Sequence, residues 1–353
     1  MNIAFFGSSL LSAYWNGAAT YYRGMIRALD ARGHRVTFYE PDAYERQSHR
    51  DIEPPSWARS VVYANNLAAM RACLHEARSA DVLIKASGVG VFDEELEAGV
   101  LELKRPSNIV LFWDVDAPAT LERVQSNSAD PFRALVPRYD AILTYGGGAP
   151  VALGYGALGA RECVPIFNAL DPQTHHPAPR DERFEAALGF LGNRLPDREA
   201  RVEEFFWKAA RLCPAQVLAL GGAGWNDHAR PKNVNYLGHV YTRDHNAFHT
   251  TPRLALNISR DSMARFGFSP ATRVFEATGA GACLVSDWWQ GIEEFFEPNR
   301  EILVAKSGEE VAAFVEEVDE ARARSLGRAA LRRALSDHTY AQRAQQFEEL
   351  ISA

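Results

Sequence analysis

The sequence predicts an α/β protein built of two doubly wound parallel sheets, and three observations support this fold class. Short apolar runs bounded by turn residues alternate with segments of helical periodicity along the chain, as in parallel sheets covered by helices. The length of 353 residues is more than a single hydrophobic core usually serves. A proline-rich break near the middle separates two halves, and each half repeats the alternation.

The first half begins with the apolar run from Asn2 to Phe6. No lysine or arginine precedes this run and Gly7-Ser8-Ser9 interrupts it, so we interpret it as a buried strand rather than a signal peptide. Helices are expected between the strands, notably over residues 18–32 and 60–78. The strands expected in this half are residues 2–6, 35–39, 81–86, 108–113, 139–144 and 163–167.

The second half repeats this pattern and then changes character. After residue 304 the chain is helical and charged, and a last helix opens near Thr339 with no strand after it. Such a tail needs a surface to dock on. The strands expected in this half are residues 187–191, 215–220, 234–237, 253–258, 282–285 and 301–304.

The break between the halves covers residues 168–180 and carries three prolines in eight residues. Proline disrupts both a helix interior and a central strand, so neither is expected there. We therefore expect four parts along the chain. They are an N-terminal domain over residues 1–168, a linker over 169–180, a C-terminal domain over 181–335 and a final helical segment over 336–353.

Composition and charge exclude several classes of protein. Apolar residues make up 47% and charged residues 24% of the chain, as in ordinary globular proteins. The formal charge of −7 provides no general basic field for nucleic acid or anionic lipid, so any phosphate site must be local. The four cysteines lack CxxC spacing and are expected as reduced thiols. Because no run of about 18 apolar residues occurs, we expect a cytoplasmic protein without a transmembrane segment. The negative net charge leads us to expect no nucleic-acid partner.

The segment that opens with Ser269-Pro270 is the strongest candidate binding element. Serine followed by proline is typical of a helix start, and Gly279 and Gly281 would end the helix before the next strand. The spacing places four side chains on one face, and a helix N-terminus beside an arginine suits a diphosphate while a carboxylate one turn deeper suits the hydroxyls of a ribose. The plain alternative is an Arg273–Glu276 pair on the surface. The four residues of this face are Ser269, Thr272, Arg273 and Glu276.

Glycine-rich turns after the first strand form a second candidate. In open α/β sheets, ligands bind outside the carboxyl ends of the strands. Gly17, in the run from Asn16 to Thr20, would let the backbone approach a ligand closely, although a plain turn and helix cap explains it equally well. The pattern is not GxGxxG, which disfavours a nicotinamide dehydrogenase.

The segment from Ser269 to Ala305 resembles the CgeB-like (spore-maturation protein) family, a branch of the GT-B glycosyltransferases. The residues that carry the resemblance include Arg273–Ala277 and Asp287–Phe296. Further runs extend it over nearly the whole chain. These runs are residues 16–24, 112–118, 144–148, 190–198 and 238–240.

The resemblance implies two Rossmann-like domains facing each other across a cleft. The first domain would hold the acceptor, the second would hold the sugar nucleotide, and the final helix would cross back onto the first domain. It also implies that Glu276 binds the ribose and that the loop Gly238-His239-Val240 lies against the base.

The same resemblance bears on the diphosphate and the donor sugar. Arg194 and Arg198, in the run that includes Asn193, match the position where related transferases place cations on the diphosphate. In many retaining relatives a second glutamate stands seven residues before the ribose glutamate. Here that position is Ser269, so the recognition of the donor sugar and the stereochemical course stay open.

Asp114 and Asp116 form a DxD sequence after an apolar strand and allow three interpretations. Paired carboxylates can hold Mg²⁺ or Mn²⁺ with a diphosphate, as in metal-dependent GT-A transferases, but the two-sheet organisation argues against this. A carboxylate at the end of a strand can also act as a general base, and we prefer Asp116 for that role. Either residue can instead simply cap the following helix. His239, His245 and His249 lack a completing ligand at fixed spacing, so no metal site is expected.

These observations together predict a metal-independent glycosyltransferase that needs no cofactor. It would move a sugar from a nucleotide-diphosphate donor, expected to be a UDP-sugar, to an unidentified acceptor. Arg194, Arg198 and the helix after Ser269 would neutralise the leaving diphosphate. Two rivals remain: a sugar-nucleotide epimerase of the same fold, and a non-catalytic protein that binds a sugar nucleotide.

Overall fold

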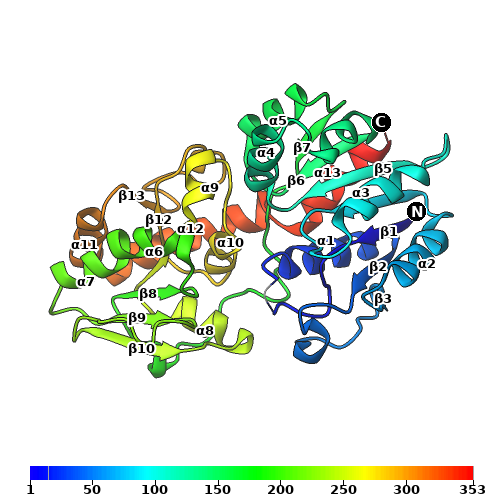
Figure 1. The fold of residues 1–353 in the computed structure, drawn as a ribbon. Helices are drawn as coiled ribbons and strands as arrows, with labels where there is room; N and C mark the ends of the chain where they lie inside the picture. The colour runs from blue at the N-terminus through cyan, green and yellow to red at the C-terminus, as the bar shows by residue number, and fades with distance from the viewer. Residues whose placement is uncertain (15, 353) are drawn as a thin grey trace. The chain divides into compact units, whose positions relative to one another are not determined.

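The computed structural model describes residues 1–352 except residue 15, and the chain forms two compact units (Figure 1). Unit 1 consists of residues 1–167 together with the chain from Tyr340 onwards, and unit 2 consists of residues 168–339. Each unit contains one parallel sheet covered by helices on both faces. No helix among the described residues is both long and apolar enough to cross a bilayer.

The sheet of unit 1 has seven parallel strands in the order β3-β2-β1-β4-β5-β6-β7. The order reverses between β1 and β4, which is the point where open α/β sheets place ligands. The strands are β1 (Asn2–Phe6), β2 (Arg35–Pro41), β3 (Arg59–Tyr63), β4 (Val82–Ala86), β5 (Ile109–Asp114), β6 (Ala141–Thr144) and β7 (Cys163–Pro165).

Helices follow the strands of unit 1, with short 3₁₀ turns in the loops. The helices are α1 (Ala19–Ala31), α2 (Leu67–Ala77), α3 (Asp93–Glu102), α4 (Ala117–Ser126), α5 (Gly148–Ala157) and the C-terminal α13 (Tyr340–Ser352). The 3₁₀ turns are η1 (Arg46–His49), η2 (Pro131–Ala134) and η3 (Val136–Arg138).

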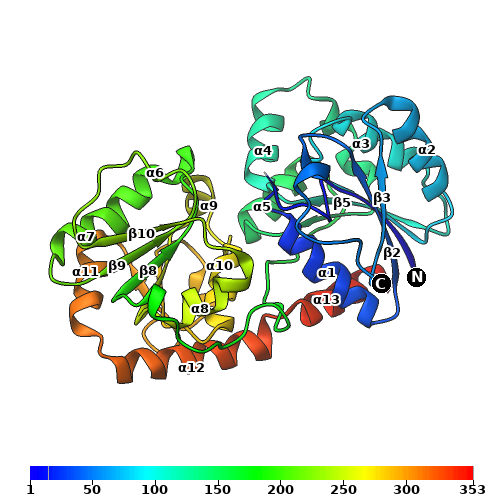
Figure 2. The same cartoon turned by 90° about the horizontal axis from the view of Figure 1, so that it is seen from below.

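The C-terminal helix α13 packs against α1, so the end of the chain completes the first unit (Figures 1 and 2). A Cβ at Gly24 would overlap the ring of Tyr340, so only glycine allows this close approach. The ring of Trp113 stacks on Phe347 with centroids 5.6 Å apart. The final helical segment was expected over residues 336–353, but the preceding helix α12 ends at Asp337, inside that segment. Residues 169–180, expected as a linker, lie within unit 2.

The sheet of unit 2 has six parallel strands in the order β10-β9-β8-β11-β12-β13, which reverses between β8 and β11. The strands are β8 (Leu188–Leu191), β9 (Leu218–Gly221), β10 (Val234–Gly238), β11 (Leu254–Asn257), β12 (Leu284–Asp287) and β13 (Leu303–Ala305). All six lie within three residues of the strands that the apolar runs predict.

The helices of unit 2 include one that changes its winding midway. It runs as α6 (Pro196–Val202), a π-helical turn η5 (Glu203–Trp207) and α7 (Lys208–Leu212). The others are α8 (His245–Thr250), α9 (Asp261–Phe266), α10 (Thr272–Gly279), α11 (Gly308–Glu317) and α12 (Glu320–Asp337), with 3₁₀ turns η4 (Glu182–Phe184), η6 (Thr242–Asp244) and η7 (Ile292–Glu294).

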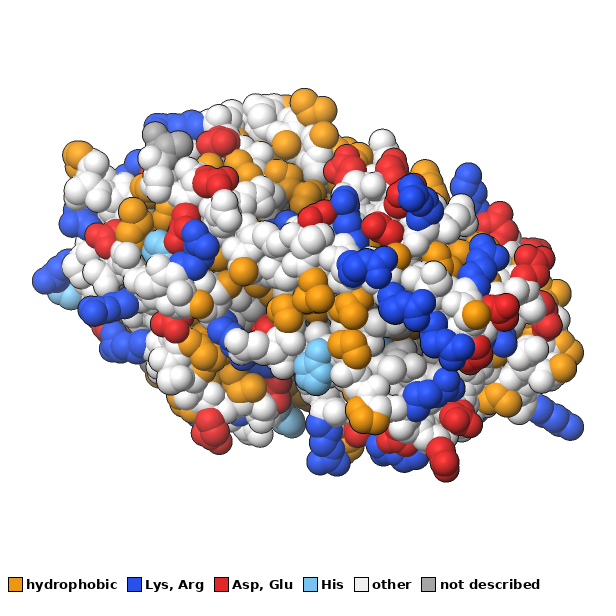
Figure 3. Space-filling view, turned by 180° about the vertical axis from the view of Figure 1, so that it is seen from behind, with side chains coloured by type: hydrophobic (Ala, Val, Ile, Leu, Met, Phe, Trp, Pro, Cys, Tyr) orange, Lys and Arg blue, Asp and Glu red, His pale blue; other side chains and the backbone are white. Residues whose placement is uncertain are grey.

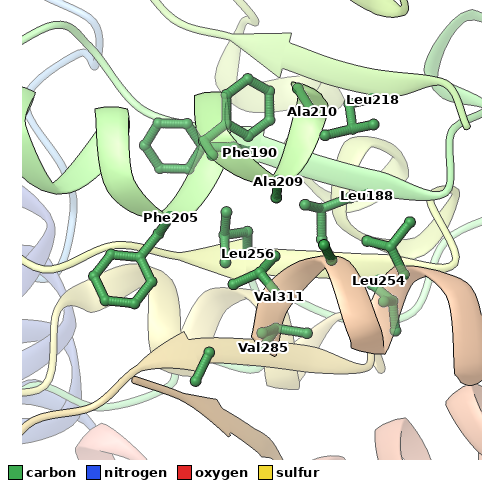
Figure 4. Packing of buried hydrophobic residues seen from close by; sticks show 14 of the residues in the cluster. Leu188, Phe190, Phe205, Ala209, Ala210, Leu218, Leu254, Leu256, Val285 and Val311 are labelled. Atoms are coloured by element: carbon green, nitrogen blue, oxygen red, sulfur yellow. The ribbon is translucent and has the colours of Figure 1, made fainter. Parts of the chain in front are cut away.

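The core of unit 2 lies between its sheet and the helices α7 and α11 (Figure 4). Leu188, Leu254 and Leu256 point from the strands toward Ala209 and Val311, and none of these side chains is more than 1% exposed. Burying a side chain of this size contributes about 1.5 to 3 kcal/mol. This core holds the strand ends that carry the candidate site in place.

Two predictions about local structure are wrong. The helix expected over residues 60–78 begins only at Leu67, after the cap Asn66, and Arg59–Tyr63 form the edge strand β3 paired in parallel with β2. The Val-Val-Tyr triplet has strong β propensity, and pairing with β2 satisfies its backbone. The helix expected to open at Ser269 begins three residues later, at Thr272.

Candidate functional site in unit 2

The candidate site lies at the carboxyl edge of the unit 2 sheet, where β8 and β11 meet and the strand order reverses. The loop after β8 leads into α6, and the loop after β11 leads into α9 and then α10. Backbone N–H groups and helix starts gather at such an edge, which makes it suitable for phosphate groups.

Gly192 lets two guanidinium groups reach the end of β8. A Cβ at this position would lie 3.0 Å from Nη1 of Arg198 and 3.3 Å from Nη2 of Arg273. Any larger residue would therefore press against both cations. The predicted residues Arg198, on α6, and Arg273, on α10, are thus brought together by the tertiary structure.

Arg198 carries a positive charge that no described carboxylate contacts directly. Its guanidinium makes no hydrogen bond or ion pair with any described residue, and its Nε is buried without a partner. Burial and the nearby Arg273 lower the pKa of Arg198 to about 9, so the group is still a cation at neutral pH. A buried unpaired cation is costly unless an anion binds to it.

Arg273 is held in place from the strand β11. Its Nη1 donates to Oδ1 of Asn257 at 3.2 Å, and its guanidinium lies over the ring of Phe190 at 5.5 Å. Burial lowers the pKa of Arg273, and the negative charge of Glu276 partly offsets this effect. The amide of Asn257 orients the arginine without neutralising it, so the positive charge remains available to a ligand.

Glu276 is partly buried on α10, one turn beyond Arg273. The surface ion pair that spacing alone allows does not form, because Glu276 makes no ion pair or hydrogen bond with any residue that the structure describes. Instead, its charge acts on Arg273 and on His245 of α8 without direct contact. A carboxylate near Arg273 that has no partner among the described residues can accept hydrogen bonds from a bound polar ligand.

The start of α10 differs from the sequence-based expectation. Ser269 is buried and its hydroxyl donates to the carbonyl of Gly267 at 2.9 Å, so it caps no helix and shares no helical face with Glu276. The physical reason is the turn at Gly267 and Phe268, both with positive φ, which keeps the chain extended up to Ala271. Thr272 is the first helical residue.

Arg194 and Asn193 have partners within the chain. The guanidinium of Arg194 pairs with Glu199 and, at 3.2 Å, with Asp227. Oδ1 of Asn193 accepts from the N–H of Ala223 at 2.9 Å and ties the β8 loop to the β9 loop. Unlike Arg198, Arg194 is therefore already neutralised by carboxylates.

The loop Gly238-His239-Val240 follows β10 and combines three environments. Gly238 has φ of +67° with open space where a side chain would lie, and its carbonyl accepts from the N–H of Gly222 at 2.7 Å. His239 is exposed, with its ring edge against Tyr241. Val240 is buried in an apolar cluster with Phe184, Ala219 and Phe248. Only Gly238 and His239 present an open surface.

Two residues that sequence reasoning did not single out as site residues organise this edge. Asp287, at the end of β12, is fully buried and accepts from Ser259 and from both Nε and Nη2 of Arg201. Burial raises the pKa of Asp287, while Arg201 and Ser259 oppose that rise. Asn257 ends β11 in the same position. A polar residue directly after an apolar strand was the signal available in the sequence for both.

Three histidines lie close together, two of them on α8. The rings of His175 and His245 are 6.3 Å apart, and those of His245 and His249 are 6.5 Å apart. His249 is buried with both ring nitrogens unpartnered, and burial holds its pKa well below the usual value. Over the described residues, no three His, Cys, Asp or Glu side chains are arranged to hold a metal ion.

In unit 1, Asp114 and Asp116 differ sharply. Asp114 is fully buried and accepts from the hydroxyls of Ser87, Thr120 and Tyr155 and from the N–H of Asp116. Its lone pairs are used by the protein, which suits a structural role. Asp116 is partly exposed at the N-cap position of α4, but its side chain makes no capping hydrogen bond there.

Gly17 lies in the turn before α1 and is exposed. A Cβ at this position would meet nothing within 4 Å, so close packing within the chain does not require glycine here. The preceding Asn16 is buried and donates to the carbonyls of Ser9 and Ser12. These bonds fix the loop between β1 and α1.

Comparison with known proteins agrees with the geometry. Residues 198–349 match a family described as glycosyl transferase-like. No curated protein matches the sequence. Sucrose-phosphate synthase from Thermosynechococcus elongatus is similar in structure, with a TM-score of 0.72 and 14% identity over 100% of this chain and 98% of that one.

Two further solved structures carry nucleotides. Anabaena HepE in complex with UDP-glucose matches with a TM-score of 0.67 and 14% identity, covering 100% of this chain and 99% of the other. An α-glucosyltransferase in complex with UDP and a DNA 13-mer matches with a TM-score of 0.71 and 13% identity over the whole of both chains. The chain therefore has the GT-B fold, with a glycosyltransferase-like second half.

Proposed function

We propose that this protein is a glycosyltransferase that takes a sugar from a UDP-sugar and transfers it to an acceptor bound by unit 1. As part of the proposal, it belongs to the CgeB-like branch, which the runs around Arg273 and Asp287 resemble. The observation that carries the proposal is the unneutralised pair Arg198 and Arg273 beside Gly192. Similar structures that hold UDP or UDP-glucose support the choice of nucleotide.

In this proposal, Arg198 and Arg273 bind the diphosphate and stabilise the charge that develops as it leaves. Fixed cations at a partly buried site stabilise such a charge more strongly than water does. Glu276 accepts hydrogen bonds from the ribose hydroxyls. The exposed surface at Gly238 and His239 receives the base.

In this proposal Asp116 accepts a proton from the acceptor hydroxyl. Asp114 is not assigned this role, because it is fully buried and accepts hydrogen bonds from Ser87, Thr120 and Tyr155. The two guanidinium groups take the part that a metal ion plays in other transferases, so the proposed reaction is metal-independent.

A donor screen tests the proposal. Melting temperatures are measured with UDP-, GDP-, dTDP- and CMP-sugars, since a ligand at 100 times its Kd stabilises the folded state by about 2.7 kcal/mol. We expect a rise with UDP-sugars alone, and the Arg198→Ala variant should lose it. Products are then analysed with candidate acceptors present and absent. A converted donor sugar without acceptor would indicate an epimerase, and tight binding without any turnover would indicate a binding protein.

A further inference from the structure

The helix α12 carries an unusual concentration of positive charge on the outside of unit 2. Its 18 residues include Arg322, Arg324, Arg328, Arg332 and Arg333, while its only acidic residues, Glu320 and Asp337, stand at its two ends. The chain as a whole has a net charge of −7, whereas this helix has more positive than negative residues.

The helix is rigidly attached by its other face. Its buried side is made of small and apolar residues, and a Cβ at Gly327 would lie 2.2 Å from the carbonyl oxygen of Gly281, so the backbone contacts the body of unit 2 directly. Figure 2 shows α12 along the outer side of unit 2, and Figure 3 shows basic side chains gathered on that side. The arginines therefore project from a fixed platform.

Internal pairing accounts for only part of these charges. Arg333 pairs with Asp337 at 2.7 Å. Arg322, Arg328 and Arg332 form no ion pair with any residue in the described part of the chain, and they are exposed. Arg324 pairs with Glu320 at 3.5 Å across an exposed surface, and such a pair contributes little. The helix dipole favours cations only near the C-terminal end, so it does not explain arginines in the first turns and the middle.

The pattern on the exposed face combines cations with leucines. Arg324, Arg328, Leu331, Arg332 and Leu335 follow one another at positions i, i+4, i+7, i+8 and i+11, which is one face of a helix. The three arginines span about 12 Å along the axis. Leu335 is 45% exposed and Leu331 is partly exposed. The helix has no aromatic residue on which a nucleic-acid base could stack.

From this arrangement we propose that the exposed face of α12 docks unit 2 onto a membrane surface rich in anionic phospholipid. The arginines bind lipid phosphates, and the two leucines enter the headgroup region, as in other interfacial amphipathic helices. This surface is separate from the candidate donor site, so the proposal does not depend on the sugar-transfer reaction.

The test is co-sedimentation of the full chain with vesicles of phosphatidylcholine alone and of phosphatidylcholine with about one-third phosphatidylglycerol, at about 0.1 M salt. We expect binding only to the anionic vesicles and its loss at about 1 M salt. The variant Arg324→Ala/Arg328→Ala/Arg332→Ala should bind about 100-fold more weakly, because each arginine near such a surface contributes about fivefold. The corresponding triple lysine variant should retain binding.

A matched control removes the same number of positive charges from other parts of the surface. Arg161→Ala/Arg211→Ala/Arg300→Ala removes three exposed arginines from other elements and should bind anionic vesicles like the unchanged protein. Circular dichroism checks that each variant is folded. Equal loss in both triple variants, absence of binding to anionic vesicles, or binding to single-stranded DNA but not to vesicles would each overturn the proposal.

Discussion

Replacing Arg198 by alanine should change donor affinity and protein stability in opposite directions. In the unliganded chain this guanidinium is partly buried, lacks a partner among the described residues, and lies with Arg273 beside Gly192. Its removal relieves an electrostatic penalty in the free protein. In the proposed donor complex, however, the same removal deletes a cation from the diphosphate.

The expected loss of affinity follows from the strength of a hydrogen bond to a charged group. Such a bond contributes about 1.5 to 3 kcal/mol, so the donor Kd should rise by roughly 10- to 150-fold. Arg194→Ala should weaken binding less, since Arg194 already pairs with Glu199 and Asp227 and carries no free charge.

The expected gain in stability follows from the lowered pKa. A fall from the ordinary value of 12.5 to about 9 corresponds to a penalty of roughly 5 kcal/mol on the charged form. Part of the group is exposed to water, which screens the charge, and alanine leaves a small void. We therefore expect a net stabilisation of about 1 to 2 kcal/mol in the Arg198→Ala variant.

Two measurements on the same samples test this reasoning. Calorimetric titration with the donor found by the screen gives the Kd, and urea denaturation without donor gives the free energy of unfolding. Arg211→Ala is the control, because Arg211 lies at the far end of the same continuous helix and pairs with Glu203. A variant at Arg198 that binds the donor normally, or that is destabilised without it, would refute the assignment of a poised anion site.

Further predictions concern the carboxylates, the metal and the histidines. Glu276→Gln should weaken donor binding by about 1.5 to 3 kcal/mol without altering the melting temperature, and an unchanged Kd in calorimetry would exclude the ribose role. Turnover and donor binding should survive EDTA, whereas loss with EDTA and recovery with Mn²⁺ would contradict metal independence. Asp116→Asn should lower turnover by about 10²- to 10⁴-fold at constant donor affinity. Asp114→Asn should instead lower the free energy of unfolding by about 1 to 3 kcal/mol. Turnover assays and thermal melting distinguish these two effects. Because burial holds the pKa of His249 below that of the unfolded chain, the unfolded state binds an extra proton below about pH 6.5 and stability falls there by about 1.4 kcal/mol per pH unit. In the His249→Phe variant, the melting temperature should depend less on pH between pH 6.5 and 5. An unchanged pH dependence of the melting temperature would argue against a buried neutral histidine.

The strands other than β3 were predictable because each coincides with a short apolar run between turn residues. In the stretch from Ile3 to Phe6, burial on both faces leaves a continuous apolar pattern that can be recognised without knowing the neighbouring strands. Edge strand β3 has a weaker pattern, since it opens with Arg59 and Ser60 and most of its residues are only half-buried. It becomes a strand only because β2 offers it a hydrogen-bonding edge.

The residue types of the candidate site were also visible in the sequence, but their states were not. Arg194 and Arg198 look equivalent along the chain. Only the folded structure shows that Arg194 pairs with Glu199 and Asp227. Arg198 lies instead beside Arg273, with no ion pair to any described residue. In the same way, spacing alone allowed an Arg273–Glu276 ion pair. In the structure, Arg273 instead donates a hydrogen bond to Asn257 on β11.

The sequence by itself determined the α/β class and the two sheets, because these follow from hydrophobic periodicity within short windows. The residues of the proposed sugar-nucleotide site were selected by side-chain chemistry together with the family resemblance. The tertiary structure decided which charges are compensated, where α10 begins, and that the arginines of α12 share an exposed face in a chain whose net charge is negative. These properties depend on contacts between residues far apart in sequence and on burial, and net charge and local spacing do not contain that information.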